Sequence, residues 1–300
     1  MSLVHRTPDN RFADMVDYTF VPNFIEDLPS FSGLRTHYLD EGPMEAEDVF
    51  LCLHGEPTWV YLYRRMIPEF VAVHGRVVAP DMFGFGRSDK PADEGIYTFD
   101  FHRRLLIEFI EYLDLTNITL VCQDWGGLLG LTLPVDLPDR FCRLIVMNTM
   151  LGTGDEPLSK GFLAWRQWVR DNPDLKVGRL LKRACPHLSE EEALAYDAPF
   201  PNTQFLAGVK RFPELVPDNP DALGAAISRR ARDWWRNEWR GQSFMAIGMA
   251  DPVLGAPVMY GLHSNIRGCP PPREVANGGH FLQEWGRGIA RAALESFEQG

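Results

Sequence analysis

The sequence predicts an α/β fold in which a mostly parallel central sheet is flanked by helices and interrupted by a helical insertion. The first observation is that short apolar runs alternate with segments of helical spacing from residue 49 onward, the pattern of βα units in a parallel sheet. The second is that this alternation stops between residues 148 and 242 and returns afterwards. A fold of this class needs a large buried interior, and 300 residues are enough to form one.

Five apolar runs are expected to form strands of the sheet. The first, V-F-L-C-L-H, contains no Asp, Glu, Lys or Arg and is typical of a strand buried on both faces. In chain order, the expected strands cover residues 49–54, 76–80, 118–122, 143–148 and 243–249. The segments between and after them carry apolar residues at helical spacing. Helices are therefore expected near residues 61–71, 98–115, 126–137 and 281–297.

The segment between residues 148 and 242 contains helix-type stretches with no strand-like run between them. One helix is expected to begin at Ser189, because S-E-E-E places Glu192 three positions later and so forms a capping box. Several prolines interrupt this segment, among them Pro173, Pro186, Pro199, Pro201, Pro213, Pro217 and Pro220. Residues 151–242 are therefore predicted to form a helical cap, inserted into a core made of residues 1–150 and 243–300.

Composition and charge exclude several classes of protein. The formal net charge of −11 argues against a nucleic-acid partner, because phosphate binding needs clustered Lys and Arg. No apolar run approaches the roughly 20 residues that span a bilayer, and the first residues lack a signal-peptide core. The five cysteines are scattered without a metal or disulfide motif. We therefore expect a cytoplasmic monomer that binds no metal, no nucleic acid and no membrane.

Three polar residues follow expected strands or precede the last helix. Asp124 follows the run ending at residue 122, Asp251 follows the run ending at residue 249, and His280 stands just before residues 281–297. The carboxyl ends of parallel strands meet along one edge of the sheet, so these three side chains are candidates for a common site. Their order along the chain, with an acid or serine nucleophile first and His last, is that of α/β-hydrolase triads.

The chain resembles the haloalkane dehalogenases of the α/β-hydrolase superfamily, in a subfamily with a tryptophan in its cap. Seven segments carry the resemblance over nearly the whole chain: H-G-E-P-T-W from His54, P-D-M-F-G-F-G-R-S-D-K-P from Pro80, Q-D-W-G-G from Gln123, G-F-L-A-W from Gly161, A-P-F-P from Ala198, F-M-A-I-G-M-A-D from Phe244 and G-G-H-F-L-Q-E from Gly278. The resemblance implies hydrolytic conversion of a haloalkane to a primary alcohol, halide and a proton. It implies no cofactor, and a small halogenated alkane, halide and water as the molecules bound.

Serine hydrolases of this fold carry their nucleophile on a sharp strand-to-helix turn of pattern G-x-S-x-G, the nucleophile elbow, and Asp124 occupies its central position here. Chemistry explains why this position can hold a carboxylate. Attack by an ionised Asp124 on a saturated carbon forms an alkyl ester, which water can hydrolyse, whereas attack by serine would leave an ether. His280 would then be the general base that activates the water, and Asp251 would orient His280 and stabilise its cation. The resemblance thus implies a covalent alkyl-aspartyl ester as the intermediate.

The remaining expected roles concern the oxyanion, the halide and the pocket. An elbow offers the backbone N–H of the next residue, Trp125, to the oxyanion, and the resemblance places the second backbone donor at Glu56. Indole N–H groups only donate, which suits a halide in an apolar site, and Trp125 is one such donor by the resemblance. Spacing leaves Trp165 and Trp168 open as the second donor, and the G-F-x-A-W match selects Trp165. The pocket is expected to be lined by Phe162, Leu128, Phe212 and Pro213.

Two alternatives belong to different classes of function. An epoxide hydrolase also uses an aspartate elbow, but it protonates its leaving group, usually from a pair of cap tyrosines. Between residues 150 and 242 the sequence contains one tyrosine, Tyr196, which disfavours this alternative. A noncatalytic α/β-hydrolase that only binds a ligand would typically lack one member of the triad. Asp124, Asp251 and His280 are all present, so catalysis is preferred.

Overall fold

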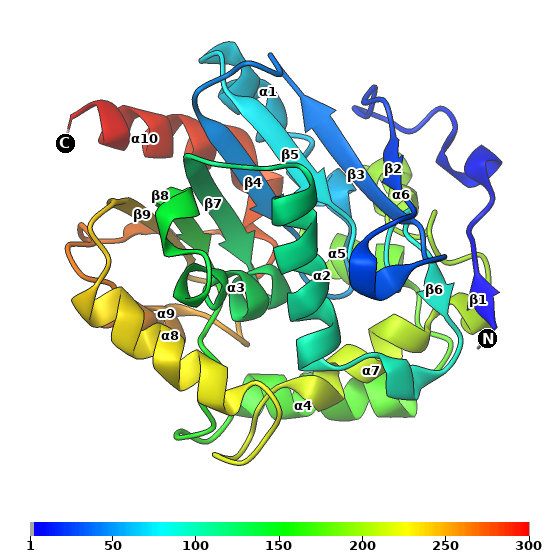
Figure 1. The fold of residues 1–300 in the computed structure, drawn as a ribbon. Coiled ribbons are helices and arrows are strands. Elements are labelled where there is room, and N and C mark those ends of the chain that lie inside the picture. The colour runs from blue at the N-terminus through cyan, green and yellow to red at the C-terminus, as the bar shows by residue number, and fades with distance from the viewer. Residues whose placement is uncertain (1–2, 300) are drawn as a thin grey trace.

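A computed structural model describes residues 3–299, which contain one large mixed sheet (Figure 1). Its eight strands, in sheet order, are β10 (Arg273–Val275), β9 (Gln242–Gly248), β8 (Phe141–Met147), β7 (Ile118–Gln123), β4 (Val49–Leu53), β5 (Arg76–Pro80), β3 (Thr36–Glu41) and β2 (Asn23–Ile25). The strands from β10 to β5 are parallel, whereas β3 is antiparallel to β5 and β2 to β3. A short ribbon pairs β1 (Val4–His5) with β6 (Lys90–Pro91).

The central strands are buried because their sequences are apolar on both faces. All five residues of β4 and all six residues of β7 are buried. In register, Leu51 of β4 lies beside Leu120 of β7, which in turn lies beside Leu144 of β8. Each parallel strand is thus covered on both sides, and its carboxyl end is the place where polar side chains emerge.

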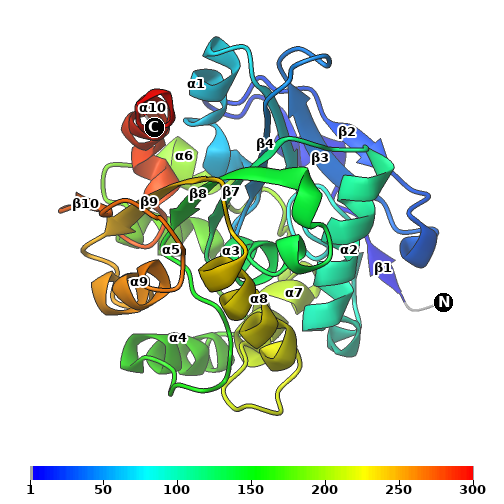
Figure 2. The same ribbon diagram turned by 60° about the vertical axis from the view of Figure 1, so that its left-hand side comes forward.

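Helices cover both faces of the sheet (Figure 2). Those outside the 148–242 segment are α1 (Ile67–Ala72), α2 (Phe99–Tyr112), α3 (Trp125–Gly130), α9 (Ala256–His263) and α10 (Gly286–Glu298). Helix α1 packs against α10, while α2 packs against α3, which follows β7 directly. Within residues 3–299, no helix is both long enough and apolar enough to cross a membrane.

Five helices connect β8 to β9: α4 (Lys160–Asp171), α5 (Val177–Ala184), α6 (Glu190–Ala195), α7 (Ala207–Leu215) and α8 (Ala225–Asn237). The described residues between these two strands contain no strand, and α6 begins with the capping box predicted at Ser189. Helix α4 packs against α7 and α5 against α6, and Figure 1 shows α4 and α7 beyond the carboxyl ends of the parallel strands. Helix α8 instead packs beside the core, where Trp235 Nε1 donates to the Leu131 carbonyl at 2.8 Å.

Three of the expected helices are shorter than the sequence pattern indicated. The stretch 61–71 divides into a 3₁₀ helix, η3 (Val60–Tyr63), and α1, which has Pro68 in its first turn. Helix α3 ends at Gly130, four residues before Pro134, and the expected C-terminal helix begins as a 3₁₀ helix, η8 (Leu282–Trp285), followed by α10. Proline has no N–H to continue an α-helical ladder, which explains the first two breaks.

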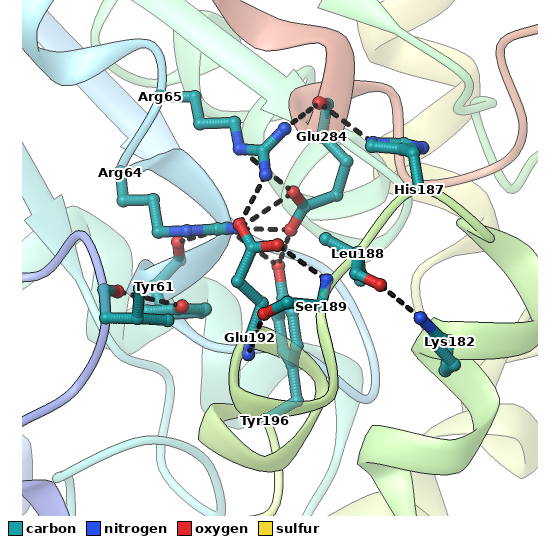
Figure 3. Close-up of polar contacts among 11 residues, drawn as sticks. Tyr61, Arg64, Arg65, Lys182, His187, Leu188, Ser189, Glu192, Tyr196 and Glu284 are labelled. Carbon is teal, nitrogen blue, oxygen red and sulfur yellow. Dashed lines mark hydrogen bonds and ion pairs between the residues drawn. The ribbon is translucent and has the colours of Figure 1, made fainter.

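A buried polar network joins three segments that are far apart in the sequence (Figure 3). The guanidinium of Arg64, directly after η3, binds both carboxylate oxygens of Glu284 in η8, at 2.7 and 3.0 Å. It also binds Glu192 of α6 at 2.7 Å, and the Tyr196 hydroxyl donates to Glu284. We call Arg64, Arg65, Glu192, Tyr196 and Glu284 the junction network, because it ties the helical insertion to the core.

Candidate active site

Asp124 occupies a sharp turn between β7 and α3. Its φ angle is 50°, in the left-handed region that non-glycine residues rarely adopt. The turn brings its backbone against neighbouring strands, so a Cβ on Gly126 would collide with the Leu53 carbonyl oxygen. The backbone is held there by Asp124 N–H donating to Asn148 at 3.0 Å and by Thr149 Oγ1 donating to the Asp124 carbonyl at 2.7 Å. A strained turn fixed in this way presents its side chain at the carboxyl edge of the sheet.

The two carboxylate oxygens of Asp124 have different surroundings. Oδ1 accepts a hydrogen bond of 2.8 Å from the backbone N–H of Glu56, in the loop after β4. Oδ2 lies 3.5 Å from Nε2 of His280. One oxygen is therefore fixed by a backbone donor, while the other faces the imidazole.

His280 connects Asp124 to the second acid, Asp251. Nδ1 of His280 lies 2.9 Å from Oδ2 of Asp251, which also accepts from Asn148 Nδ2 at 2.7 Å. The backbone N–H of Val253 donates to the other oxygen of Asp251 at 2.7 Å. Since a carboxylate only accepts, Nδ1 of His280 carries a proton and Nε2 faces Asp124. The structure thus brings the three predicted residues into one row, joined by the His280–Asp251 hydrogen bond and the His280–Asp124 ion pair.

Charges set the protonation of this row. Burial alone would lower the pKa of His280, but the charges and hydrogen bonds of Asp251 and Asp124 outweigh it and raise that pKa to about 10. Burial would likewise raise the pKa of Asp251, yet His280, Asn148 and the Val253 N–H hold it below the usual range. His280 is therefore an imidazolium, held between Asp251 and Asp124, before Asp124 is modified.

A cavity of about 570 Å³ lies between this row and the helical insertion. Glu56, Asp124, Trp125 and His280 line its core side. The insertion contributes mostly apolar side chains, and those that bear on the predictions are Phe162, Trp165, Trp168 and Pro213. Asp251 is not among the residues that line the cavity, and it contacts His280 through Nδ1.

Two residues expected to line the pocket lie elsewhere. Phe212 is fully buried behind Trp125, with the ring centres 4.7 Å apart, and it supports that indole from outside the cavity. Leu128 is buried one turn along α3 from Trp125, and it belongs to the hydrophobic core. Both residues were expected in the pocket for the same reason. Residue spacing alone does not show which face of a helix points into the cavity.

The indole of Trp125 differs from those of the other buried tryptophans. Trp59, Trp235 and Trp239 each donate their indole N–H to a protein oxygen, at 3.2, 2.8 and 2.9 Å. Trp125 is only 3% exposed, and no described residue accepts from its indole nitrogen. Buried indole N–H groups usually have a partner, so this donor is available to a ligand in the cavity.

Trp165 and Trp168 both line the cavity, so the structure does not separate them by position alone. Their rings stack with centres 5.4 Å apart and planes tilted by 21°. The Trp165 side chain also interacts with the carboxyl group of Glu56, and this interaction lowers the pKa of Glu56. That proximity places Trp165 beside the loop that binds Asp124 Oδ1.

One carboxylate oxygen of the Glu56 side chain has no hydrogen-bond partner among the described residues. Glu56 is 4% exposed, and the oxygen without a partner within residues 3–299 is Oε1. Burial and the neighbouring Asp124 charge raise the pKa of Glu56 well above the usual range, and Trp165 offsets only part of this rise. Glu56 therefore keeps its proton to higher pH than an ordinary carboxyl group does, a property beyond the backbone role that the sequence suggested.

Two polar residues of the site were not assigned roles from the sequence. Gln123 donates through Nε2 to the His280 carbonyl at 3.1 Å, and the same nitrogen lies 3.1 Å from His280 Nε2. Asn148 binds Asp251 and also accepts from the backbone N–H of Gly248, at 2.7 Å. Both stand at the ends of central strands, β7 and β8, which is the signal that could have identified them.

Residues 3–299 contain no group of three or more His, Cys, Asp or Glu placed to hold a metal ion.

Comparisons with known proteins agree with this geometry. The family model described as the alpha/beta hydrolase fold matches residues 48–287. A haloalkane dehalogenase of Psychrobacter cryohalolentis is 45% identical over 93% of this chain and 92% of its own, and one of Mycolicibacterium paratuberculosis is 40% identical over 94% and 93%. The solved tetrameric structure of the haloalkane dehalogenase DpaA from Paraglaciecola agarilytica is 51% identical, with a TM-score of 0.96 over 98% of this chain and 99% of that one. This chain belongs to the haloalkane dehalogenases of the α/β-hydrolase fold.

Proposed function

We propose that this dehalogenase forms a covalent alkyl ester on Asp124 and releases a primary alcohol, halide and a proton. The observation that carries the proposal is the asymmetric binding of the Asp124 carboxylate at the floor of the cavity. Oδ1 accepts from the Glu56 N–H, so Oδ2 is the oxygen that attacks the carbon bearing the halogen. The bond from Oδ2 to carbon forms as the carbon–halogen bond breaks, and the halogen leaves with the electron pair.

The departing halide needs donors that do not take up protons. The unpartnered indole N–H of Trp125 supplies one, and Trp165, across the cavity, supplies the second. A hydrogen bond to a charged group contributes about 1.5–3 kcal/mol, so two such donors stabilise halide departure appreciably. Trp168 would act as the stacking support of Trp165.

Hydrolysis of the ester requires His280 to act as a base. Once Asp124 is esterified it is neutral, and one of the causes that raise the pKa of His280 is removed. The pKa of His280 then falls, which allows Nε2 to accept a proton from the attacking water. Asp251 stabilises the imidazolium, while the N–H groups of Glu56 and Trp125 bind the oxyanion that develops on Oδ1.

The test is to trap the ester. In His280→Gln the first step remains possible, so incubation with 1,2-dibromoethane should release one equivalent of bromide and add the alkyl mass to the peptide that contains Asp124. The unmodified protein should turn over 1,2-dibromoethane and 1-bromobutane continuously and show no adduct. An adduct on another peptide, or labelled water oxygen entering the alcohol in a single turnover without first entering the protein, would contradict the proposal.

The alternative of epoxide hydrolysis lacks the cap tyrosines that usually protonate its leaving group. Tyr196 is buried in the junction network, where its hydroxyl donates to Glu284, and it is not among the cavity-lining residues. No described tyrosine lines the cavity, so a leaving alkoxide has no phenol to protonate it. The ligand-binding alternative is disfavoured by the complete row of Asp124, His280 and Asp251.

We further propose that the helical insertion acts as the cap of the site. Helix α4 supplies Phe162, Trp165 and Trp168 to the cavity and α7 supplies Pro213, which supports this role for the predicted segment 151–242. The packing of α8 on Leu131 favours a cap that ends before α8. The predicted monomer and cytoplasmic location stay predictions. Because the 51%-identical relative is tetrameric, light scattering on the purified protein is the measurement that distinguishes monomer from tetramer.

A further inference from the structure

Arg183, on the cap helix α5, lines the same cavity as Asp124. We propose that Arg183 is a specificity-determining residue that binds the anionic end of ω-halogenated carboxylates, so that such substrates enter with the halogen toward Asp124. The inference rests on the proposed function, because it assigns a substrate class to the same cavity. It concerns Arg183 and helix α5, to which the proposed function assigns no role.

The face of α5 that carries Arg183 is part of the site. Leu180, Arg183 and Ala184 line the cavity, and positions three and four apart lie on one face of a helix. The Ala184 carbonyl oxygen packs closely against Gly279. A Cβ atom added at Gly279 would lie 3.2 Å from that oxygen. Because Gly279 precedes His280, the end of α5 is fixed next to the catalytic row.

Arg183 is the cation of this cavity lining that no described acid neutralises, whereas His280 lies between Asp124 and Asp251. The titratable groups among its lining residues are Glu56, Asp124, His280 and Arg183. Arg183 is exposed, and it makes no ion pair or side-chain hydrogen bond within residues 3–299, in contrast to Lys182, which pairs with Glu190 at 3.5 Å. An exposed guanidinium with all five donors available suits a carboxylate, which it can bind with two parallel hydrogen bonds.

The surroundings of Arg183 are positive although the protein is acidic. Two further hollows adjoin the cavity at Arg183, and together their lining contains five cationic residues, Arg11, Lys176, Arg179, Lys182 and Arg183. Three acids share this lining: Asp174, Glu190 and Asp197. Of these, Glu190 is paired with Lys182 and Asp197 accepts from the Gly178 N–H at 3.0 Å. Although the chain has a net charge of −11, this patch would attract an anion to the cavity.

The two ends of the cavity therefore orient a substrate by charge. Asp124 and Asp251 together outweigh the imidazolium of His280 between them and repel a second carboxylate, while Arg183 attracts it. Because Arg183 is exposed, the anion bound there keeps its contact with water. An apolar chain between halogen and carboxylate would lie along Trp165, Trp168 and Leu180. The bound orientation is then the reactive one, with the carbon–halogen bond at Asp124.

The test compares three bromides of equal chain length but different end charge: 6-bromohexanoate, 6-bromohexan-1-ol and 6-bromohexyltrimethylammonium. An exposed ion pair changes an equilibrium by up to about fivefold, so Arg183→Gln should raise KM for 6-bromohexanoate by about that factor. KM for the alcohol should stay the same, KM for the ammonium compound should fall, and kcat for the alcohol should not change. Arg183→Lys should restore most of the effect, and added salt should diminish it.

Arg179→Gln is the matched control, because Arg179 is an exposed cation on the same helix that does not line the active-site cavity. It should leave KM for 6-bromohexanoate within about twofold of the starting value. Equal effects of Arg179→Gln and Arg183→Gln would overturn the proposal in favour of a general field, and so would an unchanged KM in Arg183→Gln. If 1-bromohexane is hydrolysed while the charge dependence is absent, only this inference fails. If no bromide is released from any of these compounds, the proposed function fails with it.

Discussion

Two groups of buried acids show how the same side chain serves different purposes in this molecule. In the junction network, Glu192 and Glu284 bind Arg64, and the remaining oxygen of Glu192 accepts from the Ser189 N–H. At the cavity, Oε1 of Glu56 has no partner, and Oδ2 of Asp124 faces only His280. Acids whose oxygens are all bound hold segments together, whereas acids with a free oxygen are available for chemistry.

The pKa values express the same contrast. Burial would raise the pKa of Glu192, but the Ser189 N–H and the guanidinium groups of Arg64 and Arg65 lower it to about 2. Burial raises the pKa of Glu56 well above the usual range, and the charge of the neighbouring Asp124 adds to this rise, whereas arginines reverse it at Glu192. The sign of the shift therefore depends on what lies beside each buried carboxyl group.

The largest expected effect is at Asp124. In Asp124→Asn the side-chain amide cannot displace a halide, so kcat for 1,2-dibromoethane should fall by about 10⁴-fold or more. The free energy of unfolding should stay close to that of the unmodified protein, because the Glu56 N–H can still donate to the amide oxygen. Bromide release and urea unfolding measure the two quantities. Turnover within tenfold of the unmodified protein would show that another residue is the nucleophile.

The second effect is on stability, and it follows from a substitution that breaks the junction network. Arg64→Met leaves Glu192 and Glu284 buried without their guanidinium, which should lower the free energy of unfolding by about 3–5 kcal/mol. Urea titration at pH 7 measures the loss. Arg140→Met is the control, because the Arg140–Asp114 pair lies at the surface and should contribute at most about 1 kcal/mol. Equal losses in the two variants would contradict the structural role of the network.

These two groups also differ in how far the sequence predicts them. Asp124, Asp251 and His280 were predictable because each stands at a strand end or before the last helix, where a parallel sheet collects its polar residues. The junction network was not, since Arg64 and Glu284 are 220 residues apart and no local pattern relates them. The charge state of Glu56 depends on burial, which a motif does not reveal.

The third effect distinguishes Trp165 from Trp168, which residue spacing and cavity lining do not separate. Trp165→Phe removes a donor to the halide and should reduce kcat/KM for 1-bromobutane by about tenfold or more, the equivalent of 1.5–3 kcal/mol. Trp168→Phe keeps an aromatic ring against Trp165 and should cost less than threefold. Halide-dependent quenching of tryptophan fluorescence should weaken in the first variant alone. The opposite pattern would exchange the two roles.

The smallest effect is the sharpest test of the comparison, because two identical substitutions should have opposite signs. Glu56 has a raised pKa, so the folded state holds a proton that the unfolded state releases above about pH 4.5, and this costs stability as pH rises. Glu56→Gln removes that cost and should raise the free energy of unfolding at pH 7. Glu192 has a lowered pKa, so its stabilisation is present above pH 4.5 and lost as pH falls toward 2. Glu192→Gln should therefore lower the free energy of unfolding at pH 7, by about 1–3 kcal/mol.

Measuring both variants from pH 3 to pH 8 separates these contributions from the loss of packing. The difference between Glu56→Gln and the unmodified protein should grow with pH, with a slope of at most about 1.4 kcal/mol per pH unit, and vanish in acid. The deficit of Glu192→Gln should instead shrink in acid, where the unmodified protein loses the same charge. Parallel pH curves for both variants would mean that neither carboxyl group exchanges a proton on folding. The contrast between a raised pKa of Glu56 at the cavity and a lowered pKa of Glu192 at the junction would then have to be abandoned.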